Sequence, residues 1–359
     1  MFNRKRLTLA RQRRGLSGIQ LAEKSGITAV TISRLESGQT RNPDEDTIAS
    51  LAHALDYPAA FFTLAQDVEE LDPDTVSFRS LKKMSSKEKD AALAAGSLGL
   101  DLYDWVETEY SLRSPDLLDL GRIGDPESAA RLLRQHWGLG DRPIGNVLRL
   151  LESKGVRVLS LSERTHNVDA FSFWRKNLPF VFLNTFKTPE HTIFDCGHEL
   201  GHLILHQHAG PRQSKSAEME ANRFAAAFLM PEHDIKAVVP RHGLSVGLII
   251  KAKQRWRVSA MALTVRLNQL GWLSDWQYRT FCIELGRRGF RSSEPNGIER
   301  ERSEIWQQIL ADLWKRRMTK KDIAQQLNLP HDEVESLIFG LAGMTTAPSI
   351  FEKPRLVSK

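Results

Sequence analysis

The sequence predicts a mainly α-helical protein with a small β-sheet, of the α+β class. Most segments carry apolar residues at helical spacing, both before residue 155 and after residue 188. Three short runs rich in β-branched and aromatic residues are confined to residues 156–184. Apolar residues make up 41% of the chain and charged residues 26%, which excludes a largely disordered or disulfide-framework protein.

The chain length and charge distribution predict several domains. A chain of 359 residues is long enough for two or three. Residues 1–65 carry nine basic and six acidic residues, residues 66–240 carry 21 and 26, and residues 241–359 carry 20 and 12. Basic ends around an acidic middle indicate ends that contact polyanions, although simple solubilising charge is an equal alternative. With only two cysteines and no long apolar run, we expect a cytoplasmic protein without a membrane span.

The first 65 residues form a string of short amphipathic segments. The first carries Leu7, Leu9 and Leu16 among six basic residues, and helices are expected over 18–24, 29–37 and 47–55. Glycine allows a tight turn at Gly26, Thr28 is a good N-cap for the third helix, and Gly38 is a C-cap. This spacing predicts a helix-turn-helix.

The motifs Gly15-Leu16-Ser17, Leu21-Ala22, Gly26-Ile27 and residues 31–38 (TISRLESG) resemble the XRE (lambda-repressor-like) DNA-binding family over about residues 3–62. The resemblance implies that the third helix enters the major groove of double-stranded DNA. The DNA contacts that it implies are Ala29, Val30, Thr31 and Arg34 for the bases, and Thr40, Arg41 and Arg11 for the phosphates. The family usually has Gln at the position of Gly18, a departure that weakens the phosphate contact of the second helix. A helix-turn-helix used only for protein contact is the alternative.

An acidic segment at residues 67–74 contains Pro73 and predicts a domain boundary. Helices are expected over 85–110, 126–137 and 144–154, and strands over 156–161, 169–174 and 180–184, the last two joined as a hairpin through 176–179. We therefore divide the chain into a DNA-binding domain (1–65), an acidic linker and helix (66–118), a central domain (119–240) and a basic helical C-terminal domain (241–359).

The segment His198-Glu199-Leu200-Gly201-His202 follows a helix start at Thr188-Pro189. A spacing of four residues places both imidazoles on one helix face, where they can share a metal ion. Zinc in a catalytic site takes nitrogen and carboxylate ligands and keeps one position open. Glu199 lies beside such an ion and can accept a proton from water.

A second helix, with Ser216 as its expected cap and Met230-Pro231 at its end, offers carboxylates for a third ligand. Glu218 and Asn222 share a face of this helix. Glu220 points about 200° away from Glu218, so only one of the two glutamates can face the metal. The spacing alone leaves the choice between them open.

This central region resembles the ImmA/IrrE family of zincin-like metallo-endopeptidases over roughly residues 120–240. The matching stretches are residues 168–174, 179–185, 194–206 and 218–231. The resemblance implies Zn²⁺ bound by His198, His202 and Glu218, with Glu199 as the catalytic base. It also implies that Asn222 orients a ligand histidine.

Three further expectations concern catalysis. The strand over 180–184 is a candidate to pair with an extended substrate. Because no Tyr lies between residues 110 and 278, an oxyanion donor would have to be His206, His208 or His233, each of which is alternatively a surface histidine. Cys196 is interpreted as a small packing residue.

The C-terminal third is basic and helical. Helices are expected over 258–270 and 276–286, and a second helix-turn-helix-like pair over 319–327 and 330–340. Its basic clusters are either a second DNA contact or dimer module, or simply solvated helix faces, which we favour. The region resembles C-terminal extensions of XRE–ImmA/IrrE fusions.

Together these features predict a bacterial or phage-type transcription regulator that carries a zinc endopeptidase. The expected protein substrate is a repressor, an antitoxin or the chain itself. The alternative is a DNA-binding repressor or antitoxin-like protein whose zinc centre is structural or sensory. The XRE resemblance also implies a homodimer on a two-fold DNA operator.

Overall fold

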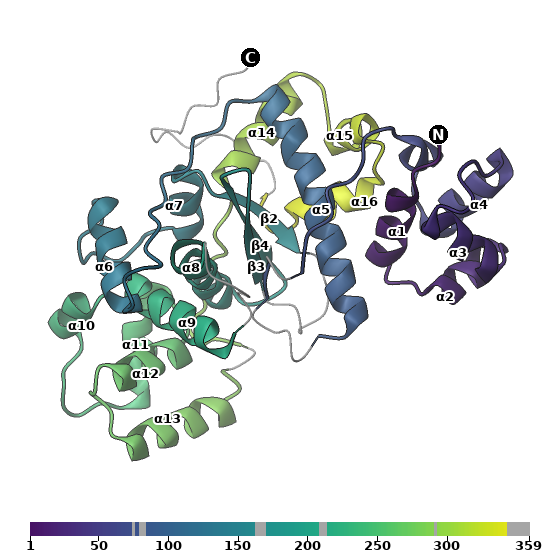
Figure 1. The fold of residues 1–359 in the computed structure, drawn as a ribbon. Coiled ribbons are helices and arrows are strands. Elements are labelled where there is room, and N and C mark those ends of the chain that lie inside the picture. The colour runs from purple at the N-terminus through teal and green to yellow at the C-terminus, as the bar shows by residue number, and fades with distance from the viewer. Residues whose placement is uncertain (74–75, 79–83, 162–169, 208–213, 291–292, 343–359) are drawn as a thin grey trace.

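The computed structural model describes residues 1–73, 76–78, 84–161, 170–207, 214–290 and 293–342. It confirms the α+β class, with many helices around one small sheet (Figure 1). The residue at position 169, the expected start of the second strand, lies outside the described residues. Within these ranges, none of the helices is both long and apolar enough to cross a membrane.

The N-terminal unit consists of short helices, and its elements are α1 (Arg4–Arg13), α2 (Gly18–Ser25), α3 (Ala29–Ser37), α4 (Glu45–Leu55) and the 3₁₀ helix η1 (Ala59–Thr63). The Thr28 hydroxyl accepts from the backbone N–H of Thr31 at the start of α3. Gly26 and Gly38 end α2 and α3 with φ of 72° and 78°, a conformation that costs glycine little. Ile32 and Leu35 bury the inner face of α3.

The sheet has four strands, β1 (Ser77–Phe78), β2 (Arg157–Leu161), β3 (Ala170–Arg175) and β4 (Leu178–Asn184), in the order β1-β3-β4-β2. Strands β3 and β4 form the expected hairpin, with Phe173 opposite Phe180. Lys176 and Asn177 form its turn with φ of 49° and 64°, as a tight two-residue hairpin turn requires. Strand β2 pairs parallel to β4.

The position of β4 corrects one expectation. The strand over residues 180–184 was a candidate partner for an extended substrate, but β4 lies between β3 and β2. Both of its edges are already paired with neighbouring strands, so it has no free backbone groups for another peptide. The acidic segment also contributes more than a boundary, since it leads into the two-residue strand β1 at the edge of the sheet.

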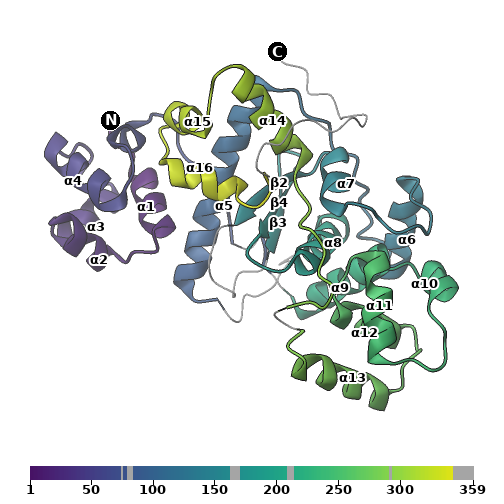
Figure 2. The ribbon, with the colours of Figure 1, turned by 180° about the vertical axis from the view of Figure 1, so that it is seen from behind.

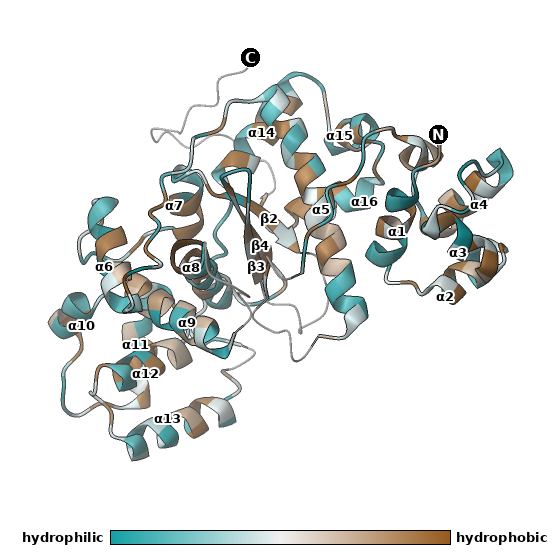
Figure 3. Cartoon of the chain, viewed as in Figure 1, coloured by the Kyte–Doolittle hydropathy of each residue, from teal (hydrophilic) through white to brown (hydrophobic). Residues whose placement is uncertain are grey.

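Helices cover both faces of the sheet. Helix α5 (Ser86–Glu109) lies on one face, where a Cβ atom at Gly99 would come within 2.6 Å of Leu159 and Phe182 side-chain atoms. Helix α8 (Pro189–Leu205) contacts β3 and β4 from the other face, because the Ser172 side chain of β3 bonds to Glu199 of α8. In Figure 3 both α8 and the inner strands are coloured as hydrophobic.

Helix α9 (Lys215–Leu229) packs along α8, and α6 (Pro126–His136) and α7 (Val147–Ser153) complete this layer. Glycine on α8 permits the close approach: a Cβ atom at Gly201 would lie 3.1 Å from Phe224 and 3.2 Å from the Cα atom of Ala221. Ser214, and not the expected Ser216, caps α9, because the Ser214 hydroxyl accepts from the N–H of Ala217. The helix therefore begins one residue before Ser216.

The C-terminal third divides into two parts. Its first elements lie beside α9, namely α10 (Glu232–Val238), α11 (Val246–Ala252), η2 (Lys253–Trp256), α12 (Ala260–Gln269) and α13 (Asp275–Arg287). The chain then returns past the sheet as α14 (Glu304–Lys315), α15 (Lys320–Leu327) and α16 (His331–Ile338). Both ribbon views place α15 and α16 between α5 and the N-terminal unit (Figures 1 and 2).

Candidate metal centre and DNA-binding helix

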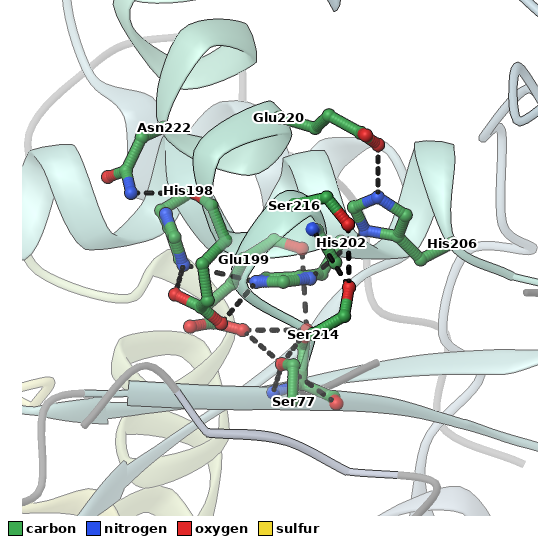
Figure 4. Close-up of polar contacts among 12 residues, drawn as sticks. Ser77, His198, Glu199, His202, His206, Ser214, Ser216, Glu220 and Asn222 are labelled. Atoms are coloured by element: carbon green, nitrogen blue, oxygen red, sulfur yellow. Dashed lines mark hydrogen bonds and ion pairs between the residues drawn. The ribbon is translucent and has the colours of Figure 1, made fainter. Parts of the chain in front are cut away.

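Helices α8 and α9 bring three of the sequence-predicted residues to one point. His198 and His202 lie one turn apart on α8 and are fully buried, and Glu218 faces them from the first turn of α9. One ligand atom from each of the three side chains lies within 4.8 Å of the others, a group that could hold a metal ion. Figure 4 shows the two imidazoles side by side above the sheet.

The distances between these atoms fit a tetrahedral ion. The Nε2 atoms of His198 and His202 are 3.1 Å apart. Oxygens of Glu218 lie 3.4 Å from Nε2 of His198 and 3.2 Å from Nε2 of His202. A tetrahedron with metal–ligand bonds of about 2.0–2.1 Å has edges of about 3.3 Å, so the three side chains already stand at the spacing of zinc ligands.

Both histidines lower the pKa of Glu218. Burial raises its pKa, but the hydrogen bonds and charges of His198 and His202 outweigh burial and hold the pKa of Glu218 at about 2. The group is therefore ionised, as a carboxylate ligand must be.

Glu199 is fully buried beside the ligands and is held by two serine hydroxyls. Ser77 of β1 and Ser172 of β3 each donate to Oε2 of Glu199 at 2.7 Å. Burial raises the pKa of Glu199 to about 7, against the lowering effects of His202 and the two hydroxyls. A carboxylate with such a pKa is suited to accept and return a proton near neutral pH.

A second histidine–carboxylate pair contacts one of the two candidate ligand histidines. Nδ1 of His206 lies 3.1 Å from Nδ1 of His202, and Nε2 of His206 lies 3.0 Å from a carboxylate oxygen of Glu220. The structure thus brings Glu218 to the two buried histidines. It turns Glu220 toward His206, one step further out (Figure 4). Such outer partners fix the orientation of a ligand imidazole.

Asn222 has a different partner from the one expected. Its side-chain amide donates to the backbone carbonyl oxygen of Glu218 at 2.7 Å, within the same helix. An amide one turn after Glu218 reaches that carbonyl more easily than a ring on α8. The contact at the Nδ1 side of His202 comes instead from His206.

The three oxyanion candidates fall in different places. His206 is committed to His202 and Glu220. His233 is exposed on α10 and lines a surface pocket of about 400 Å³ that contains none of the three metal-ligand candidates. His208 lies outside the described residues. Cys196 is buried, and burial raises its pKa well above the ordinary value, which agrees with a packing role.

The third helix of the N-terminal unit presents most of its expected DNA contacts outward. Ala29, Val30 and Arg34 are exposed, and the Val30 side chain is 60% exposed although it is apolar. Thr31 is half-buried and its hydroxyl lies 2.9 Å from that of Thr28. An exposed valine on this helix suits contact with a thymine methyl group.

The three residues expected to contact DNA phosphates lie in different environments. Arg41 is exposed and Thr40 half-buried just beyond α3. For Arg11 the expected phosphate contact is corrected. Its guanidinium forms a bidentate ion pair with Glu36 at 2.7 and 3.1 Å and also donates to the carbonyl oxygen of Leu16. These contacts join α1 to α3, so Arg11 stabilises the fold of the unit instead of facing DNA. At Gly18 an added Cβ atom would meet nothing within 4 Å.

Several of the C-terminal basic residues are committed to ion pairs. Lys253 is buried between Glu190 and Glu294, at 3.3 and 3.0 Å. Two nitrogens of the Arg255 guanidinium donate to the two carboxylate oxygens of Asp234. These two basic side chains hold the helical layer together, so Lys253 belongs neither to a solvated helix face, as expected, nor to a surface that contacts DNA.

The sequence patterns did not predict the partners of Glu199 and His202. Ser77 follows the acidic segment 67–74 taken as a boundary, and no motif marks it. Ser172 and His206 both lie inside stretches that carry the ImmA/IrrE resemblance, but nothing in their spacing assigns them a partner. Only the fold, which sets β1 and β3 beneath α8, places these side chains at the site.

Comparison with known families supports both units. Residues 7–62 match the model of a helix-turn-helix family, and residues 151–268 match the IrrE N-terminal-like domain of the M78 peptidases. Both resemblances noted in the sequence are thereby confirmed. The peptidase-family match begins after β1 and α5 and extends through α12. Among curated proteins, none matches the chain.

Proposed function

Because the chain joins an XRE-type helix-turn-helix to an ImmA/IrrE-like peptidase domain, we propose that it is a DNA-binding transcription regulator carrying a zinc-dependent endopeptidase. Its substrate is a regulatory protein: another repressor, an antitoxin-like protein or the chain itself. The observation that carries this proposal is the convergence of His198, His202 and Glu218 at the spacing of zinc ligands, with the carboxylate of Glu199 beside them.

The donor set fits zinc in particular. Two imidazole nitrogens and one carboxylate match a catalytic zinc site, which keeps a fourth position for water or substrate. When bound, zinc supplies Lewis acidity, which acidifies water and polarises a peptide carbonyl group.

The chain's own residues would carry the proton. Glu199 accepts a proton from the attacking water on its carboxylate and returns it to the nitrogen of the leaving amine. Ser77 and Ser172 hold one carboxylate oxygen of Glu199 and fix its orientation. His206, backed by Glu220, does the same for His202.

Glu199 also separates this proposal from its alternative, a repressor whose zinc is structural or sensory. A structural site needs ligands but no base, and structural zinc sites usually have four protein ligands. The described residues offer three here, which favours the peptidase.

The test compares zinc-loaded wild-type protein with Glu199→Gln, and with Glu232→Gln as a matched control on a half-exposed glutamate outside the site. Each protein is expressed in the same cells, and newly formed protein N-termini are identified by mass spectrometry. We expect new N-termini with wild type and Glu232→Gln and none with Glu199→Gln, with equal zinc content in all three. Cleavage retained by Glu199→Gln would contradict the proposed mechanism.

DNA binding is tested separately on operators selected from a random DNA pool. The proposed interface predicts an affinity that falls steeply as salt rises, because phosphate contacts release counterions. Loss of affinity in Arg34→Ala, with an unchanged melting temperature, would support base contact by α3. Salt-independent or absent binding would instead indicate a helix-turn-helix that contacts only protein.

A further inference from the structure

The segment between the two units is anchored at both of its ends. On the N-terminal unit, Asn3 donates to the carbonyl oxygen of Leu64 at 3.2 Å and Arg6 donates to that of Gln66 at 3.1 Å. Further along, Leu71 packs where a Cβ atom at Gly96 of α5 would come within 2.3 Å of it. The segment then reaches β1, the edge strand of the sheet.

Strand β1 covers the part of the outer edge of β3 that holds Phe171 and Ser172. It pairs antiparallel, with Ser77 opposite Ser172 and Phe78 opposite Phe171. The other edge of β3 is paired with β4. Among the described residues, β1 is therefore the segment that pairs with the edge of β3 that β4 leaves free.

The side chain of Ser77 reaches the catalytic centre from this edge. Its hydroxyl lies 2.7 Å from Oε2 of Glu199 and 3.1 Å from the hydroxyl of Ser172, and it accepts from the N–H of Ser172 at 3.0 Å. Ser77, Ser172 and Glu199 all have no solvent exposure. Figure 4 shows Ser77 on its strand directly beneath Glu199.

An extended peptide that is to be cut here needs the same place. Peptides in extended form bind a sheet by adding a strand to an open edge, where main-chain hydrogen bonds hold them. This edge belongs to β3, the strand whose Ser172 side chain contacts Glu199. A bound peptide and β1 cannot both pair with this edge of β3 at the same time.

We propose that β1 acts as a built-in competitor of the substrate: it occupies the β3 edge that takes an extended peptide of another polypeptide, and Ser77 covers the base Glu199. The site opens when β1 leaves β3. This inference rests on the proposed peptidase function, whose substrate class it narrows to extended segments able to pair antiparallel with β3. Asn3 and Arg6 hold the carbonyl oxygens of Leu64 and Gln66, so the chain that leads to the blocking strand starts from the DNA-binding unit.

Two sets of full-length variants test this proposal. Ser77→Glu places a second carboxylate against Glu199 and should drive β1 off the sheet, while Ser77→Ala removes the hydroxyl but leaves the strand. The pair Ser77→Cys/Ser172→Cys, made with Cys282→Ser, can lock β1 by a disulfide, because directly opposite residues of an antiparallel pair stand within disulfide reach. Its reduced form is the matched control for its oxidised form.

The readout is binding of two fluorescein-labelled probes, measured by anisotropy. One probe is a valine- and threonine-rich hexapeptide ending in a hydroxamate, which binds both the edge and zinc. The other is the same hexapeptide ending in an amide, which needs only the edge. We expect Ser77→Glu to bind both probes at least about tenfold more tightly than wild type, and the oxidised lock to bind both less tightly than its reduced form.

Two results would overturn the proposal: equal probe affinity in wild type, Ser77→Glu and both redox states of the lock, or no binding of the amide probe by any of them. Loss of the proposed zinc function gives a different pattern. Without zinc, the hydroxamate would bind no more tightly than the amide, while the dependence of amide binding on β1 would persist. The two failures are therefore distinguishable in one set of titrations.

Discussion

Removing one buried carboxylate should weaken the contact between the DNA-binding unit and helix α16. Glu333 of α16 is 1% exposed. It accepts from Nε of Arg13 at 2.8 Å and from the hydroxyl of Tyr57 at 3.0 Å, and Nη1 of Arg14 lies 3.4 Å away. Glu333→Ala leaves these groups without their shared partner. Breaking a buried ion pair from one side costs about 3–5 kcal/mol.

Hydrogen exchange measures this effect locally, which suits a chain of several units better than one global transition. A cost of about 3–5 kcal/mol should lower amide protection in α1 and α16 by about two to four orders of magnitude. The matched control is Glu335→Ala on the same helix, whose pair with Lys320 is exposed and worth about 1 kcal/mol at most. Equal loss of protection in both variants would refute the assignment of Glu333 as the link between the units.

Three further predictions concern pH and DNA. Burial raises the pKa of Glu152 to about 7 from an ordinary 4.5, so the folded protein keeps a proton that the unfolded chain loses. Stability should therefore fall as pH rises from about 4.5 to 7, and Glu152→Gln should reduce this slope of melting temperature against pH, to which Glu199 also contributes. Arg34→Ala should lower operator affinity about tenfold or more, whereas Arg11→Ala should mainly lower the melting temperature; the reverse pattern would contradict both assignments. Gly18→Gln should raise operator affinity, since the added side chain meets open space; an unchanged affinity in anisotropy titrations would argue against a phosphate contact by α2.

Local sequence patterns predicted most of the elements because their causes are local. Gly26 sets the end of α2, Thr28 and Gly38 set the bounds of α3, and Thr188-Pro189 sets the start of α8. The placement of His198 and His202 on one face of α8 followed from helical periodicity alone. The choice of Glu218 needed the family resemblance as well, since spacing left Glu220 open.

What could not be predicted depends on contacts between distant segments. Ser77 and Glu199 are 122 residues apart, and only the pairing of β1 with β3 brings them together. The substrate role expected of residues 180–184 failed for a related reason, because strand order is a tertiary property. The expected roles of Arg11 and Asn222 overlooked nearer partners, Glu36 and the carbonyl oxygen of Glu218.

The most direct test of the central claim is metal content. Wild type, Glu218→Ala and Glu220→Ala would be purified without added metal, and zinc per chain measured by elemental mass spectrometry. Because Glu218 faces both ligand histidines whereas Glu220 faces His206, we predict about one zinc per chain in wild type and Glu220→Ala and a large loss in Glu218→Ala. Absence of zinc from wild type, even after zinc is offered, would contradict the account and make the histidine pair of α8 purely structural.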